Sequence, residues 1–226
     1  MEYPDFADRA AAVRARIDAA VARGGHSQQV TLVAVTKTHG AEAVEAAYAS
    51  GVIDVGENKV QEALEKMKDV SVPVRWHLIG HLQRNKVRAV DQFTLVHSVD
   101  SARLADAVHK FGVERGRPVD ALVQVNGSRE ETKGGYQPGD LRAEAERLAL
   151  LSGIRICGVM TMARLGAGEL ELRESFASAR AARDVLAAAG HPAKELSMGM
   201  SQDFEIAVEE GATMVRLGTT LFGARE

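Results

Sequence analysis

The chain has 226 residues, enough to bury a large hydrophobic core in one α/β barrel or in two small domains. Its 28 Lys and Arg residues nearly balance 31 Asp and Glu residues, and this net charge of −3 argues against a nucleic-acid or anionic-membrane partner and favours a small molecule. The single cysteine, Cys157, excludes an intramolecular disulfide, and the lack of a signal-peptide pattern or a membrane-length apolar run predicts a cytoplasmic protein.

The first predicted elements are a helix, a strand and a second helix. Apolar residues recur at three- and four-residue steps over residues 5–23, which predicts an amphipathic helix. Residues 30–37 then form a β-branched and Leu-rich run typical of a buried parallel strand. The last residue of this run is Lys37. Residues 41–50 follow with the Ala and Glu content of a helix. Since strand C-termini point into the functional mouth of a parallel barrel, Lys37 is either a catalytic-site amine or an ordinary solvated lysine.

The same alternation of strands and helices continues to the end of the chain. Further strands are predicted at 53–56, 74–80, 94–99, 119–125, 154–160, 194–198 and 213–217. Helices are predicted between them at 60–70, 84–90, 102–114, 139–152, 169–189 and 202–210. Eight such units predict an α/β fold, a (β/α)8 TIM barrel that forms a single domain over residues 1–226. Little chain follows the eighth strand, so we expect the N-terminal helix to cover that face.

Small and hydroxyl residues follow the last two predicted strands. They occur at 197–201 and again at 216–220, where barrels commonly bind phosphate through backbone N–H groups and hydroxyls. Ser201 has an alternative structural role as the N-cap of the helix at 202–210. The presence of two such loops at neighbouring strand ends favours the phosphate site.

The predicted phosphate loops and Lys37 should be neighbours, because the eighth strand pairs with the first when a barrel closes. A lysine amine beside a phosphate site indicates a Schiff base with a phosphorylated aldehyde. The ligand is then either the sugar-phosphate substrate of an aldolase or the cofactor pyridoxal 5′-phosphate. Composition and spacing do not separate these two.

Six stretches are specific enough to indicate a family. They are LVAVTK at 32–37, GENKVQE at 56–62, WHLIGHLQRNK at 76–86, MTM at 160–162, LSMGMS at 196–201 and VRLGT at 215–219. With these, the chain resembles the YggS-like pyridoxal phosphate homeostasis proteins from its first strand to its eighth. The resemblance implies a barrel like the N-terminal domain of alanine racemase, with pyridoxal phosphate held as an aldimine.

The resemblance also implies residue roles. By matching positions, Lys37 would carry the imine, and Ser201, Gly218 and Thr219 would hold the phosphate. Arg216 resembles the arginine that faces the pyridine nitrogen, where a permanent cation disfavours protonation of the ring. In isolation, the alternative for Arg216 is a surface salt bridge.

Other polar residues are expected at the same mouth. Asn58 follows the second strand, and its amide would meet the cofactor ring or its phenolic oxygen. His77, within the third strand, is either a hydrogen-bonded core histidine or a catalytic group. His81, Gln83 and Asn85 follow on a polar loop and have no assigned role. Lys133 lies in a Gly-rich loop and is either a solvated charge or a basic group that meets the anionic ligand.

Racemases of this kind need a second acid or base, which in the alanine racemase family comes from a separate domain that this chain lacks. Tyr136 and His77 are the available substitutes. A site without that group holds the aldehyde but catalyses carbanion chemistry poorly. We therefore expect a monomeric, non-catalytic carrier in vitamin B6 and amino-acid homeostasis, with apo-enzymes that use the cofactor as possible clients and with no metal site. A weak amino-acid racemase is the alternative.

Overall fold

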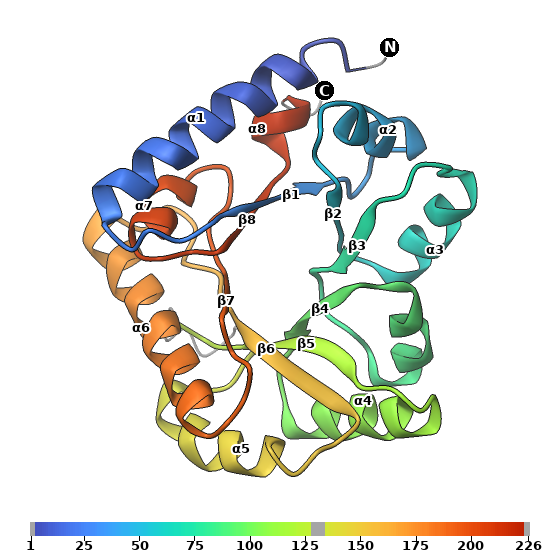
Figure 1. Cartoon of the computed structure of the whole chain (residues 1–226), viewed down its shortest axis with the longest axis vertical. Coiled ribbons are helices and arrows are strands. Elements are labelled where there is room, and N and C mark those ends of the chain that lie inside the picture. Colours follow the sequence, from blue (N-terminus) through green and yellow to red (C-terminus); the bar gives the residue numbers. More distant parts are fainter. Residues whose placement is uncertain (1–2, 128–133, 224–226) are drawn as a thin grey trace.

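The computed structural model describes residues 3–127 and 134–223. In this part of the chain eight parallel strands pair in chain order and close into a barrel, because β1 pairs with β8 (Figure 1). The strands are β1 (Thr31–Val35), β2 (Asp54–Glu57), β3 (Arg75–Leu78), β4 (Leu95–Val99), β5 (Val119–Gln124), β6 (Ile154–Met160), β7 (Glu195–Ser197) and β8 (Met214–Leu217). The predicted (β/α)8 barrel is confirmed.

Helices surround the barrel and alternate with the strands (Figure 1). They are α1 (Phe6–Gly24), α2 (Ala41–Ala49), α3 (Val60–Asp69), α4 (Ala102–Glu114), α5 (Leu141–Leu148), α6 (Glu169–Ala188), α7 (Phe204–Glu209) and α8 (Thr219–Phe222), with 3₁₀ helices η1 (Arg84–Gln92) and η2 (Pro138–Asp140). Among the described residues no helix is long and apolar enough to cross a membrane.

Several predicted elements differ from the structure in their bounds or type, and two of these differences have a clear local cause. The first strand ends at Val35 rather than Lys37, because the chain enters a turn in which Thr38 has a φ of 68°. The segment predicted as an α-helix over 84–90 is the 3₁₀ helix η1, in which Val87 and Val90 are buried at a three-residue spacing.

The N-terminal helix closes the outer layer where the chain ends. Helix α1 packs against α7 and α8, which follow the last two strands (Figure 1). Two ion pairs of 2.6 Å, Arg16 with Glu205 and Arg23 with Glu209, join α1 to α7. The expectation that the N-terminal helix covers the barrel beside the eighth strand is therefore confirmed. The short helix α8 also follows that strand.

The barrel interior has an apolar layer and a polar layer. Leu95, Leu122, Met160 and Met214, from four strands, form an apolar cluster of their own. His97 in β4 and Arg216 in β8 lie two positions after Leu95 and Met214. Their side chains therefore point to the same side of each strand, into the barrel. The polar layer therefore lies nearer the C-terminal ends of the strands.

Candidate functional site

A pocket of about 790 Å³ opens at the C-terminal ends of the strands. Every residue that the sequence assigns to the cofactor lines it: Lys37, Asn58, Ser201, Arg216, Gly218 and Thr219. These side chains come from β1, β2, β7 and β8 or from the loops that follow them. Closure of the barrel through the β1–β8 pair brings the two ends of the chain to the same pocket.

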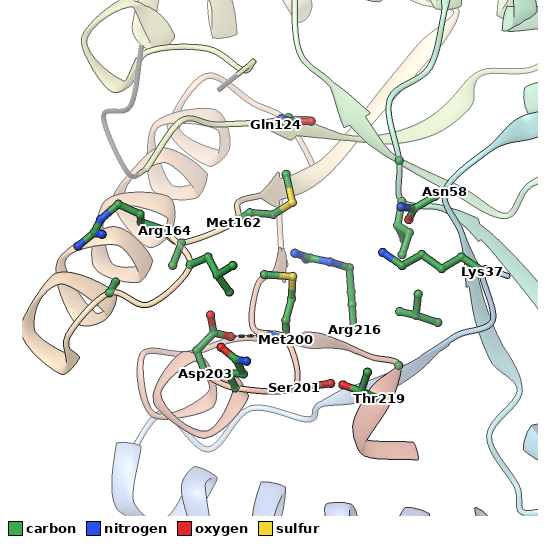
Figure 2. Close-up of a pocket in the computed structure, with 18 of the residues that line it drawn as sticks. Lys37, Asn58, Gln124, Met162, Arg164, Met200, Ser201, Asp203, Arg216 and Thr219 are labelled. Atoms are coloured by element: carbon green, nitrogen blue, oxygen red, sulfur yellow. Dashed lines mark hydrogen bonds between the residues drawn. The ribbon is translucent and has the colours of Figure 1, made fainter. Parts of the chain in front are cut away.

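Lys37 is half-buried and extends into the pocket (Figure 2). The two residues after β1 face different ways, because Thr36 contacts groups of the outer layer while Lys37 lines the pocket. The Thr36 hydroxyl donates to the carboxylate of Glu57 at 2.6 Å. Lys66 of α3 forms a buried ion pair with the same carboxylate. These contacts hold the backbone from which Lys37 projects.

The loops after β7 and β8 meet at the opposite wall. The side chains of Ser201 and Thr219 point toward one another there (Figure 2), and the backbone N–H of Thr220 donates to Ser201 Oγ at 3.4 Å. Gly199 has a φ of 93°, and a Cβ at that position would lie 2.7 Å from the Cβ of Ala207. Glycine is therefore required for the first loop to turn toward the second.

Ser201 does not cap the next helix. Helix α7 begins at Phe204, and its N-cap residue is Asp203. The Asp203 carboxylate accepts a 2.6 Å hydrogen bond from the backbone N–H of Met200, which closes the loop between them. The alternative reading of Ser201 as a helix cap is thus wrong, and its hydroxyl lies in the pocket wall.

Arg216 is buried, with 5% of its surface exposed, so it is not the surface salt-bridge residue considered above. Its Nη1 donates to Ser197 Oγ at 2.6 Å and its Nη2 to the carbonyl of Thr161 at 3.0 Å. Burial lowers the pKa of Arg216 to about 10, which the nearby carboxylate of Asp203 opposes. The guanidinium is still protonated at neutral pH. With Lys37 it makes the pocket favourable for an anion.

Asn58 follows β2 and is held by a close backbone approach. A Cβ on Gly80 would lie only 2.1 Å from the Asn58 carbonyl oxygen. Only glycine at position 80 therefore lets the end of β3 lie against Asn58. Nearby, His81 Nδ1 lies 3.0 Å from an oxygen of Asp100, and both residues line the pocket.

The remaining predicted residues lie elsewhere. Tyr136 donates through its hydroxyl to Glu144 of α5 at 2.7 Å and is not among the described residues that line the pocket. His77 is buried in the barrel interior, 2.9 Å from both Asp54 and His97. Gln83 and Asn85 are exposed and lie outside the same lining. Lys133 lies outside the described residues.

Sequence reasoning missed several polar residues of the pocket, among them His39 and Asp203. His39 lines it two positions after Lys37, and its Nδ1 lies 2.9 Å from the Tyr3 hydroxyl. Asp203 lines it as well, and burial raises the pKa of its carboxyl above the usual value. The i, i+2 spacing from Lys37 would have indicated His39. The described residues contain no group of three or more His, Cys, Asp or Glu that could hold a metal ion.

Comparisons with known proteins show which family this chain resembles. A family model described as alanine racemase, N-terminal domain, matches residues 9–226. The pyridoxal phosphate homeostasis protein of Pseudomonas aeruginosa is 41% identical over 224 residues, which cover 98% of this chain and 96% of that protein. The structure of PipY of Synechococcus elongatus PCC7942 with PLP bound has a TM-score of 0.84 at 39% identity, covering 96% of this chain and all of PipY.

Alanine racemase from Corynebacterium glutamicum has the same fold. Its structure has a TM-score of 0.73 at 16% identity, and the match covers 92% of this chain and 61% of the racemase. At this identity the likeness shows the fold alone.

Proposed function

This chain belongs to the family of the pyridoxal phosphate homeostasis proteins, and from this premise we propose that its pocket binds pyridoxal 5′-phosphate. The observation that carries the proposal is the convergence of a lysine amine, a buried arginine and two hydroxyl-bearing loops on one pocket. Because relatives are named for pyridoxal phosphate and PipY binds it, we favour this cofactor over the sugar phosphate of an aldolase.

The chemistry of the pocket residues fits the parts of this cofactor. The Lys37 amine suits its aldehyde, and the hydroxyls of Ser201 and Thr219 suit its phosphate. Gly218 lines the same wall without a side chain that would exclude the ligand. Asn58 would meet the ring, and Arg216 would face the ring nitrogen. Bound in this way, the cofactor supplies an aldehyde carbon that amines can attack and exchange.

We further propose that the protein is a carrier and not an efficient enzyme. A racemase needs an acid or base on the side of the cofactor opposite the lysine. The Tyr136 hydroxyl is engaged by Glu144, and burial, together with that carboxylate, raises the pKa of Tyr136 far above its usual value. His77 is committed to Asp54 and His97. The carrier would act as a monomer and pass the cofactor to apo-enzymes in the cytoplasm.

Borohydride reduction of the protein with pyridoxal phosphate, followed by peptide mapping, tests the binding proposal. We expect the pyridoxyl label on Lys37 and its loss in Lys37→Ala. Lys59→Ala is the matched control, because Lys59 follows Asn58 but is exposed and paired with Glu62. A label distributed over several lysines, unchanged in Lys37→Ala, would overturn the proposal.

Proton exchange tests the carrier role against the weak racemase. The protein loaded with cofactor is incubated with single-enantiomer amino acids in deuterated water. A carrier gives no exchange at Cα above that of free pyridoxal phosphate. Rapid exchange that is lost in Lys37→Ala would establish an enzyme instead.

A further inference from the structure

A continuous chain of hydrogen-bonding side chains crosses the barrel interior beneath the pocket. Arg216 Nη1 donates to Ser197 Oγ at 2.6 Å, and Ser197 Oγ lies 2.8 Å from His97 Nδ1. His97 Nε2 lies 2.9 Å from His77 Nδ1, and His77 Nε2 lies 2.9 Å from Asp54 Oδ1. Each of these side chains is buried, with at most 5% of its surface exposed.

The chemistry of the two ends fixes the direction of the terminal hydrogen bonds. Arg216 only donates, so Ser197 Oγ accepts from it, and the Asp54 carboxylate accepts at the other end. Burial, together with the charges of His77 and Arg216, lowers the pKa of His97 well below its usual value, so this ring is neutral. A neutral imidazole donates through one nitrogen and accepts through the other, so His97 links Ser197 and His77 by one hydrogen bond of each kind.

Asp54 is suited to end the chain as a carboxylate. Burial opposes its ionisation, but hydrogen bonds from His77 and from Arg75 outweigh burial and lower the pKa of Asp54 below its usual value. Arg75 Nη2 donates to the second carboxylate oxygen at 2.6 Å. The row of hydrogen-bonded side chains therefore begins with the Arg216 cation at the pocket and ends with the Asp54 anion.

This row of hydrogen-bonded side chains joins the two ends of the barrel. Asp54 and Arg75 begin β2 and β3, and both line a second cavity of about 400 Å³. Arg216 lines the pocket at the C-terminal strand ends. The link between His97 and Ser197 crosses from β4 to β7, which are not neighbours in the barrel. Backbone pairing therefore does not impose this contact.

A purely structural role does not account for these residues. The adjacent interior layer is filled by Leu and Met, so apolar side chains pack well inside this barrel. Buried polar groups cost stability unless each is satisfied, and an apolar replacement of a whole network is often neutral or stabilising. The feature that distinguishes this network is its end point, a guanidinium whose plane is fixed by Ser197 and by the Thr161 carbonyl at the edge of the pocket.

We propose that Asp54, His77, His97 and Ser197 are positioning residues that hold Arg216 in the orientation in which it meets the cofactor ring. This inference rests on the proposed function, since it concerns the same pocket. Its consequence is that the affinity of the pocket for pyridoxal phosphate depends on Asp54, a carboxylate at the opposite end of the barrel.

The experiment compares Asp54→Asn, Ser197→Ala and the control Arg75→Gln with the unaltered chain. Asp54→Asn is isosteric and cannot touch the ligand, and Ser197→Ala removes the link next to Arg216. Arg75→Gln removes the charge of the exposed donor to Asp54 but leaves the hydrogen bond between Asp54 and His77 in place. Each protein is titrated with pyridoxal phosphate, the absorbance of the bound cofactor is followed against pH, and the melting temperature is measured without ligand.

We expect Ser197→Ala to weaken cofactor binding about tenfold or more, because it loses the hydrogen bond that fixes the Arg216 guanidinium. We expect Asp54→Asn to weaken binding severalfold, because it loses the negative charge at the far end of the network. Both variants should also shift the pH dependence of the cofactor absorbance, which Arg75→Gln leaves unchanged. Affinities and absorbance profiles equal to those of the unaltered chain, whatever the melting temperatures, would overturn this inference alone. If the unaltered chain binds no cofactor, the proposed function and this inference fail together.

Should Ser197→Ala prove too unstable to titrate, the comparison of Asp54→Asn with Arg75→Gln decides. Loss of affinity in the first and not in the second supports the positioning role. An affinity of Asp54→Asn equal to that of the unaltered chain overturns it.

Discussion

The Nζ of Lys66 donates a 2.7 Å hydrogen bond to the carbonyl oxygen of Thr36, the residue immediately before Lys37. The same ammonium pairs with Glu57, which is fully buried. A charge on α3 thus fixes both the end of β2 and the backbone that carries the proposed cofactor lysine.

Lys66→Met should therefore destabilise the protein strongly. It leaves the Glu57 carboxylate buried without its cation, and breaking such a pair costs about 3–5 kcal/mol. Urea unfolding measures the loss. The matched control is Lys68→Met on the same helix, because Lys68 is exposed and its pairing with Glu65 contributes at most about 1 kcal/mol. Equal midpoints for the two variants would show that the buried pair has no such role.

Ser201→Ala and Thr219→Val should weaken binding of pyridoxal phosphate but not of pyridoxal, which has no phosphate. Each variant loses a hydroxyl donor to a dianion, and we expect a loss of about tenfold or more per variant. Equilibrium titration with both ligands measures the difference. Thr220→Val is the control, because its side chain is not among the described residues of the pocket lining. Equal losses for both ligands would assign these hydroxyls to another part of the cofactor.

Gly80→Ala should destabilise the fold and disturb the position of Asn58. The new Cβ would lie 2.1 Å from a backbone oxygen, and relief of such a clash costs about 1–3 kcal/mol. Thermal unfolding and cofactor titration should both show a loss. Gly139→Ala is a suitable control, because nothing lies within 4 Å of a Cβ there. An unchanged melting temperature in Gly80→Ala would mean that the loop shifts freely.

Tyr136→Phe should reduce stability by about 1 kcal/mol, the usual contribution of one hydrogen bond, and leave cofactor affinity unchanged. The pKa of Tyr136 is raised in the folded protein, first by burial and then by Glu144. Its contribution is therefore complete below the pKa of an unfolded tyrosine, about 10, and is lost as the pH rises further.

Unfolding measured between pH 7 and pH 11 tests both statements about Tyr136. The difference between the unaltered chain and the variant should be constant up to about pH 9 and shrink above pH 10. A marked fall in cofactor affinity in Tyr136→Phe would instead return this tyrosine to the list of acid or base candidates.

The barrel was predictable because its elements are local. The run 30–37 and the loops proposed to bind phosphate are each recognisable from a few adjacent residues, and closure of eight βα units then places Lys37 opposite Ser201. The resemblance added the roles of Asn58 and Arg216, and the predicted family is confirmed.

The polar chain through the barrel was not predictable in the same way. His97 and Ser197 are 100 positions apart and lie on strands that do not pair, so no periodic pattern relates them. The end of β1 was also misplaced, because the local turn at Thr38 with its positive φ has no signature in residue type. Interactions that depend on closure of the whole ring lie beyond sequence periodicity.

Because β1 pairs with β8, the order of synthesis separates the two halves of the pocket. A ribosome releases the strand that leads to Lys37 early and the loop that holds Thr219 only after some 180 further residues. Until then the hydroxyls of Ser201 and Thr219 are not opposite the amine, so a nascent chain lacks the second half of the proposed cofactor pocket. Capture of the ligand would accordingly report that translation has passed the eighth strand.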